Sequence, residues 1–120
     1  MAKVFLDTNF VLDIAFRKKE VLLMLNDNLV AISPLSLHIL CYVNKIKIPD
    51  DDLQMFLDEY EIVNLTKNLI KKCIIGPTED LEDNIQLHSA TEAECDVFLT
   101  NDQDLLKMKF FGKMRIVSTL

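Results

Sequence analysis

Short apolar runs rich in β-branched or aromatic residues recur along the chain, separated by longer stretches whose apolar residues have helical spacing. Such runs predict buried strands. The predicted strands are Lys3–Leu6, Leu29–Ile32, Glu61–Leu65, Asp96–Leu99 and Arg115–Val117. The stretches between them predict helices. These are Phe10–Asn28, as two helices broken near residues 17–19, and then Pro34–Ile46, Pro49–Asp58, Lys67–Ile75 and Asp80–Glu94.

The alternation of strands and helices determines the expected fold class. Parallel strands need crossover connections, and these are usually helical. We therefore expect a three-layer α/β/α fold, in which helices cover both faces of a central parallel sheet of about five short strands. The sequence contains no linker and no internal repeat, so residues 1–120 are expected to form one domain.

Local signals mark the starts of three predicted helices. Ser33-Pro34 places a capping residue before a proline in the first turn. The run Pro49-Asp50-Asp51 opens a helix with acid in its first turn, where negative charge is favourable. Thr66 can cap the helix that follows it.

Composition and charge limit the classes of function. Hydrophobic residues make up 50% of the chain, which is enough for a packed core. Thirteen Lys and Arg against nineteen Asp and Glu give a net charge of −6, which argues against a uniformly basic surface that coats nucleic acid. The apolar runs are far shorter than the roughly 20 residues of a membrane span. With no signal-peptide pattern at residues 1–7, we expect a cytoplasmic protein without a membrane partner.

Acidic and hydroxyl-bearing residues directly follow two of the predicted strands. The run Asp7-Thr8-Asn9 follows the first strand, and Thr100-Asn101-Asp102 follows the fourth. Sites in open parallel sheets form at the carboxyl ends of the strands, so we expect these side chains to lie close together. Asp83 shares a helical stripe with Leu87 and Ala90 and is expected to face the sheet.

The predicted helix that carries Asp83 contains acids but no Lys or Arg. Carboxylates that converge without a cation raise one another's pKa, and a bound divalent metal relieves the repulsion. An all-oxygen site favours Mg²⁺ or Mn²⁺. In the alternative interpretation, Asp7 and Asp102 are only helix caps, and Asp83 is only an acid in the first turn of a helix.

The same segments resemble the PIN domain, the metal-dependent ribonuclease fold of many VapC toxins. The run Val4–Asp13 is similar to the family's first strand and its Asp-Thr-Asn motif, and Ile32–Leu37 is similar to its second strand and following helix. Asp83–Asp102 is similar to its acid-bearing helix, strand and Thr-x-Asp run. The resemblance implies a PIN-like fold and hydrolysis of RNA phosphodiester bonds with Mg²⁺ or Mn²⁺.

Carried over residue by residue, the resemblance also implies a set of site residues. The catalytic, metal-ligating acids would be Asp7, Asp83 and Asp102. The substrate-binding or supporting residues would be Thr8, Asn9, Ser36, Thr100 and Asp104. The family usually has Glu, or in one branch Asn, where this chain has Ile39. Glu82, next to Asp83, is expected to point away and to be a poor substitute for the missing acid.

The resemblance implies partners as well. RNA would be the substrate, and toxin-type members bind a small antitoxin protein and often form homodimers. RNA could approach along the basic residues 17–19, or along the basic residues between Lys107 and Arg115. Such clusters are more often solvated faces.

Two other interpretations stay open. Ile39 favours a catalytically degenerate PIN-like module that binds RNA or a protein without efficient cleavage. Because an Asp at a strand end can be phosphorylated, Asp7 could instead be the nucleophile of a phosphoryl-transfer domain. Asn9 weakens this last interpretation, because a second acid is expected at that position.

Overall fold

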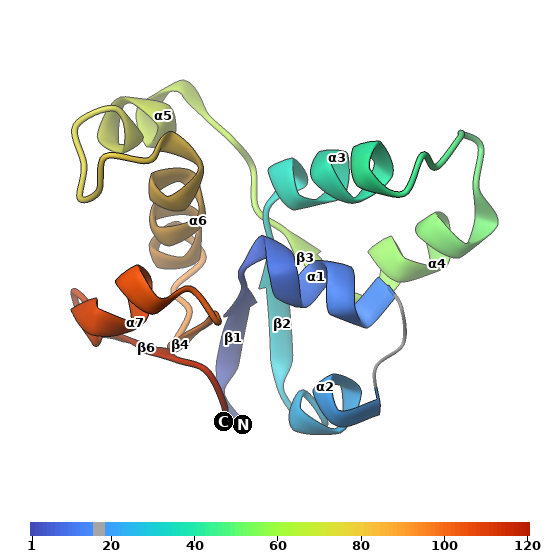
Figure 1. The fold of residues 1–120 in the computed structure, drawn as a ribbon, viewed down its shortest axis with the longest axis horizontal. Helices are drawn as coiled ribbons and strands as arrows, with labels where there is room; N and C mark the ends of the chain where they lie inside the picture. The colour runs from blue at the N-terminus through green and yellow to red at the C-terminus, as the bar shows by residue number, and fades with distance from the viewer. Residues whose placement is uncertain (16–18) are drawn as a thin grey trace.

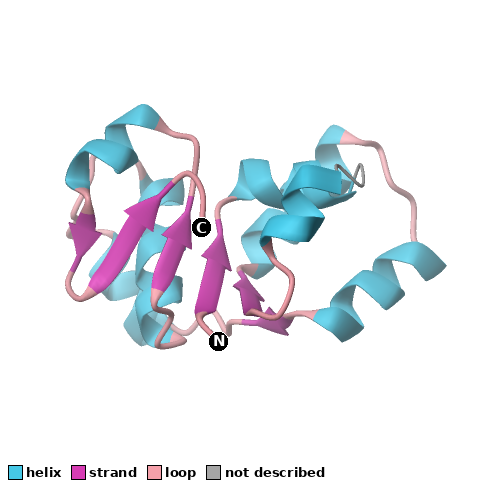
Figure 2. Ribbon diagram, turned by 90° about the horizontal axis from the view of Figure 1, so that it is seen from below, coloured by secondary structure: helices cyan, strands magenta, loops and turns pink. Residues whose placement is uncertain are grey.

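The computed structural model of the protein describes residues 1–15 and 19–120, and its centre is a mostly parallel sheet. The strands are β1 (Lys3–Leu6), β2 (Leu29–Ile32), β3 (Glu61–Ile62), β4 (Val97–Leu99), β5 (Phe110–Phe111) and β6 (Met114–Val117). Figure 2 shows them side by side, in the order β3-β2-β1-β4-β6-β5. All neighbouring pairs are parallel except β5 and β6, which pair antiparallel at one edge.

Helices cover both faces of the sheet (Figure 1). They are α1 (Thr8–Ala15), α2 (Lys19–Met24), α3 (Pro34–Val43), α4 (Asp51–Glu59), α5 (Lys67–Cys73), α6 (Leu81–Glu92) and α7 (Gln103–Met108). Helices α1 to α4 lie on one side and α5 to α7 on the other, which confirms the predicted three-layer fold. In the part of the chain that the structure describes, no helix is long and apolar enough to cross a membrane.

Alternating side chains in the strands build one core on each face of the sheet. In β1, Val4 and Leu6 pack with the apolar residues of α1, whereas Phe5 points to the α6 side. Phe5 stacks on Phe98 of β4 with ring centroids 5.6 Å apart, and both rings are fully buried. This pair holds β1 against β4, where Leu6 lies opposite Leu99, so the carboxyl ends of the two strands are level.

Capping side chains set most helix starts. Ser33 caps α3 with Pro34 in its first turn, and Thr66 caps α5, as predicted. The helix expected from Pro49 starts two residues later, because Asp50 is its capping residue. The predicted break near residues 17–19 falls mostly on residues 16–18, which lie outside the described residues.

Three details of the sheet and helices differ from the prediction. The third strand ends at Ile62 rather than Leu65. Strand β5 was not predicted, although the apolar pair before Gly112 is a hairpin signal, and Gly112 has the positive φ of 62° that glycine adopts readily. Helix α7 was not assigned a range either, although an Asp102 cap implies a helix after it.

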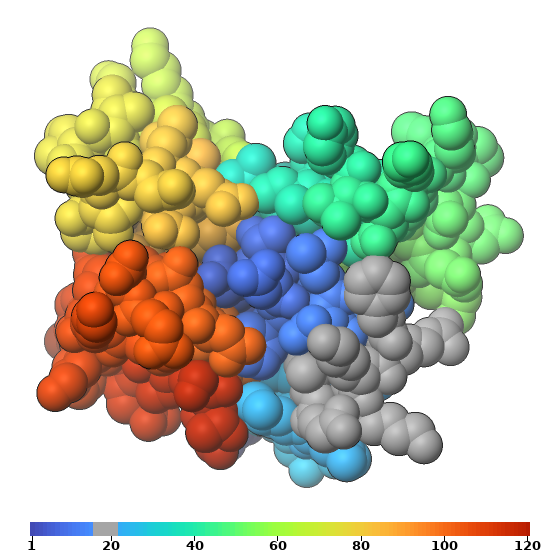
Figure 3. All heavy atoms as spheres, in the orientation of Figure 1, coloured from blue at the N-terminus to red at the C-terminus, as the bar shows by residue number. Residues whose placement is uncertain are grey.

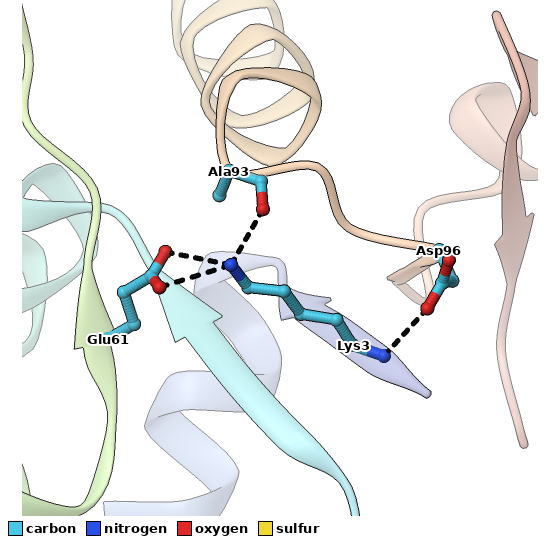
Figure 4. Close-up of polar contacts among 4 residues, drawn as sticks. All are labelled: Lys3, Glu61, Ala93 and Asp96. Carbon is cyan, nitrogen blue, oxygen red and sulfur yellow. Dashed lines mark hydrogen bonds and ion pairs between the residues drawn. The ribbon is translucent and has the colours of Figure 1, made fainter. Parts of the chain in front are cut away.

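At the amino ends of the strands, Lys3 connects three elements (Figure 4). Its Nζ donates to the two carboxylate oxygens of Glu61 over 3.1 and 3.2 Å, and to the Ala93 carbonyl over 2.7 Å. Its backbone N–H donates to Asp96 Oδ2 over 2.9 Å. These contacts tie β1 to β3 and to the α6–β4 connection, at the edge opposite the predicted site.

Candidate metal centre at the carboxyl edge of the sheet

The carboxyl ends of β1 and β4 bring two predicted site segments together. The Asp7 N–H donates to the carbonyl of Leu99, the last residue of β4, over 3.0 Å. Asp7 therefore lies directly beside Thr100, which begins the second segment. Because both segments leave the sheet at the same edge, their polar side chains share one space beyond it.

Asp7 is the most buried of the predicted acids, with 7% of its surface exposed. Its Oδ2 accepts the Thr100 hydroxyl over 2.7 Å, and its Oδ1 accepts the Thr8 N–H over 2.8 Å. Burial raises the pKa of Asp7 above its ordinary value, and the nearby Asp102 carboxylate raises this pKa further. The bonds from Thr100 and Thr8 act in the opposite direction and hold the carboxylate in one orientation.

Asp83 is brought to the same space by the first turn of α6. Burial raises the pKa of Asp83 from 3.8 to about 6, with further increases from Asp80, Asp102, Asp7 and Glu82. All of these neighbours are acids, so they destabilise the ionised form. Asp83 is half-buried, whereas Leu87 and Ala90 on its predicted stripe are fully buried against the sheet.

The tightest acidic group in this region is Asp80, Glu82 and Asp83, whose carboxylate oxygens lie within 4.8 Å of one another. Asp7, Asp83 and Asp102 are spread more widely than this group. Asp80 also caps α6 by accepting the Asp83 N–H over 2.9 Å. Asp80 was predicted only as the start of a helix, although an acid that caps a helix three residues before Asp83 lies close to Asp83.

Asp102 combines two roles. Its Oδ1 caps α7 by accepting the N–H groups of Asp104 and Leu105, over 2.9 and 3.1 Å. The interpretation of Asp102 as a helix cap is therefore confirmed. A carboxylate has lone pairs beyond those that Oδ1 uses, so capping leaves Oδ2 available to a metal or a water.

The donor set suits a hard divalent cation. Around Asp83 the structure places carboxylate and hydroxyl oxygens, and among the described residues no Lys or Arg pairs with Asp7, Asp83 or Asp102. Oxygen ligands and uncompensated negative charge are what Mg²⁺ and Mn²⁺ require. The residues present therefore fit such an ion.

Comparison with known proteins shows that the chain has a known fold. No protein-family model matches the sequence, and no curated protein matches it. A toxin–antitoxin complex from Klebsiella pneumoniae matches with a TM-score of 0.69 and 20% identity, over 82% of this chain and 86% of that chain. VapBC2 from Rickettsia felis, bound to a DNA fragment from their promoter, matches with a TM-score of 0.64 and 21% identity, over 95% and 96%. The chain shares the fold of these proteins.

This agreement confirms the PIN-like fold expected from the sequence. In that fold, the predicted supporting residues take different positions. Thr8, Ser36 and Thr100 are buried at the carboxyl edge, whereas Asn9 is exposed on α1. Asp104 is exposed in the first turn of α7 and lies 3.9 Å from Lys107. The three hydroxyl residues are therefore buried at the site, whereas Asp104 lines a surface pocket together with Asp80 and Asp83.

The expectation that Glu82 points away was wrong. The Glu82 carboxylate belongs to the tight group with Asp83, and its pKa is raised by burial and then by Asp7 and Asp80. The first turn of α6 extends past the sheet, so two adjacent residues can both face the space beyond β1. Ile39, at the position where an acid was expected, is half-buried on α3.

The approach of RNA along either basic cluster stays a prediction. Arg115 lies near the amino end of β6, where its N–H donates to the Asp96 carbonyl. Lys107, at the other end of that cluster, lies 3.9 Å from Asp104, which lines a pocket together with Asp83. Residues 17 and 18 lie outside the described residues. Exposed lysines also lie on α5, whose last turn contacts the start of α6 through Cys73 and Asn84.

Proposed function

We propose that this chain is a PIN-like ribonuclease of the VapC kind that hydrolyses RNA phosphodiester bonds with Mg²⁺ or Mn²⁺, and that it is the toxin of a toxin–antitoxin pair acting in the cytoplasm. The proposal is carried by the electrostatic coupling of three acids: the Asp102 charge raises the pKa of both Asp7 and Asp83, and among the described residues no Lys or Arg is paired with any of the three. The fold shared with toxin–antitoxin proteins supports it.

In this proposal Glu82 replaces the acid that is lost at Ile39. The family position lies on α3, but a carboxylate could reach the same space from α6. The place of Glu82 in the tight group with Asp83, and the contribution of Asp7 to its raised pKa, support this substitution. The site would then have four carboxylates: Asp7, Glu82, Asp83 and Asp102. Ile39 by itself therefore does not require a degenerate site.

The residues around the ion would divide the work of hydrolysis. When bound, Mg²⁺ or Mn²⁺ supplies a Lewis acid and lowers the pKa of a bound water. Asp7, fixed by Thr100 and by the Thr8 N–H, provides a ligand oxygen of defined orientation. Asp102 is fixed by its cap, so Oδ2 can orient the attacking water. The α5 lysines would offer positive charge to the RNA backbone.

The test is RNA cleavage by the purified chain in Mn²⁺ and in EDTA. We expect cleavage only in Mn²⁺, and a loss of about 100-fold or more for Asp102→Asn, because the substitution removes an anionic metal ligand and the carboxylate that would orient the attacking water. Asp58→Asn, an exposed acid on α4, is the matched control and should keep full activity. RNA binding that is equal in EDTA and Mn²⁺, with no cleavage in either, would instead support the binding-module interpretation.

A groove on the α1–α4 side is the surface where we propose that an antitoxin docks. It has a volume of about 500 Å³ and is lined by apolar side chains such as Leu22, Met55 and Phe56. Asp50, Asp52 and Glu59 lie among them, so the groove suits an apolar segment with basic flanks. The similar structures are toxin–antitoxin assemblies.

Met55→Asp should weaken binding of the protein encoded beside this chain by at least tenfold, because it buries a charge in an apolar contact. The affinity is measured by calorimetry with the purified partner. Ile75→Asp, at a more exposed apolar position on the opposite layer (88% against 65% for Met55), is the control. Equal effects of the two substitutions would exclude the groove.

A further inference from the structure

A buried amide links the two helical layers beneath the carboxylates. Gln86 of α6 is fully buried, and its Nε2 donates to Thr8 Oγ1 over 2.9 Å and to Ser36 Oγ over 3.1 Å. The two hydroxyl oxygens are 3.0 Å apart and share a hydrogen bond. The three side chains therefore form a closed triangle, with one corner on each of α6, α1 and α3.

The triangle crosses the carboxyl edge of the sheet. Helix α6 covers one face and α1 and α3 cover the other (Figure 1). Figure 3 shows the surface notched between the α3 segment and the α5–α6 segment, on the side toward which β1 points in Figure 1. Gln86 of α6 joins the two helical layers by its hydrogen bonds to Thr8 of α1 and Ser36 of α3.

In each helical layer, one residue of the triangle lies close in sequence to a carboxylate of the site. Gln86 is three residues after Asp83 and four after Glu82, so the three share one face of α6. Thr8 follows Asp7 and donates its N–H to Asp7 Oδ1. The triangle therefore connects the segment that carries Asp7 to the helix that carries Glu82 and Asp83.

Burying the Gln86 amide costs free energy that an apolar side chain filling the same space would not cost. Its Oε1 is buried and has no hydrogen-bond partner within the described residues. Turning the amide over would leave both N–H hydrogens without acceptors, so the amide orientation shown satisfies more groups. Burying a polar atom without a partner costs on the order of 1–3 kcal/mol, and Leu or Met would pack the layers without that cost.

We propose that Gln86 is a positioning residue: through the hydroxyls of Thr8 and Ser36 it sets the separation between the Asp7 carboxylate and the acids of α6, and so the geometry of the ion site. This inference deepens the proposed function and rests on it. It assigns a role to a side chain that holds no ion and contacts no substrate. The polar triangle acts as a spacer between two halves of one ligand set.

The test compares variants by Mn²⁺ affinity, measured by calorimetry on folded protein. Gln86→Met keeps the length of the side chain and removes its donors, and it should weaken Mn²⁺ binding by about tenfold, the effect typical of groups that orient metal ligands. Thr8→Val should do the same, whereas Thr8→Ser keeps the hydroxyl and should restore wild-type affinity. The double variant Gln86→Met with Thr8→Val should be no weaker than either single variant, because both break one triangle.

A second readout does not depend on the metal. Crystal structures of wild type and Gln86→Met in EDTA should show a wider separation of the Asp7 and Asp83 carboxylates in the variant. A purely structural role would lower the free energy of unfolding and leave both the separation and the Mn²⁺ affinity unchanged, which would overturn the proposal. If wild type binds no Mn²⁺, the proposed metal site is excluded. The distance between the Asp7 and Asp83 carboxylates in the two crystal structures still decides whether Gln86 positions these acids. Thr8→Val replaces Gln86→Met in both readouts if the latter does not fold.

Discussion

Replacing Asp83 with asparagine should abolish Mn²⁺ binding and, in EDTA at pH 7.5, raise the free energy of unfolding. The pKa of Asp83 is about 6 in the folded protein because burial and four neighbouring acids disfavour its charge. At pH 7.5 the wild-type carboxylate is ionised against that repulsion. The neutral amide of the variant avoids this repulsion. It is not an anionic ligand, however, so Mn²⁺ affinity should fall by about 100-fold or more, which is a larger loss than the one expected for groups that only orient the ligands.

The same substitution should change the dependence of stability on pH. A folded-state pKa above the ordinary value of 3.8 means that the folded protein binds more protons than the unfolded chain between about pH 4 and 6. The contribution of Asp83 to the free energy of unfolding is therefore greatest below pH 4 and is lost as the pH rises through about 6. Subtracting the Asp83→Asn urea-denaturation curve from the wild-type curve across this range isolates the contribution.

Asp58→Asn is the control for both effects. Asp58 is an exposed acid on α4, in the helical layer on the other face of the sheet from α6. Its replacement should leave Mn²⁺ affinity and the pH dependence close to those of wild type. An Asp83→Asn protein that binds Mn²⁺ as tightly as wild type would remove Asp83 from the ligand set.

Phe98→Ala should produce the largest loss of stability in the chain, on the order of 3–5 kcal/mol. The Phe98 ring is fully buried and stacks on Phe5 at an interplanar angle of 11°. Its removal leaves a cavity between β4 and α6 and breaks the contact that keeps β1 and β4 level. Urea denaturation measures the loss.

Phe110→Ala is the matched control, since this ring is 57% exposed on β5. Its loss should cost less than about 1 kcal/mol, as for most surface substitutions. Equal losses for Phe98→Ala and Phe110→Ala would show that the two-core packing does not hold the strands as described.

The strands that carry the site could be predicted because their sequences admit few alternatives. Val4–Leu6 and Val97–Leu99 are uninterrupted runs of buried residues, as expected for central parallel strands. A polar residue immediately after such a strand has to lie at the sheet edge. The meeting of Asp7 with Thr100 follows from this rule and from the parallel pairing of β1 with β4.

Glu82 could not be placed by the same reasoning. Adjacent helix residues are about 100° apart, so an argument from helical faces selects one of two neighbours. That argument holds where a helix packs on a sheet, and it fails where the first turn extends beyond the sheet. There, Asp80, Glu82 and Asp83 all reach the same space.

Gln86 was missed for a different reason. A glutamine in a helix usually lies in solvent, and nothing near it in the sequence contradicts that expectation. Its partners are 78 and 50 residues away, at Thr8 and Ser36. Only the crossing of three helices at one sheet edge shows that this amide is buried.

The most direct test of the account is a crystal structure determined in Mn²⁺, with the ion located by its anomalous scattering. The account predicts a peak at the carboxyl edge of the sheet, within coordination distance of carboxylate oxygens from both Asp7 and the first turn of α6. An edge without such a peak at saturating Mn²⁺, or a lysine or arginine paired with Asp7 or Asp83 in its place, would contradict it.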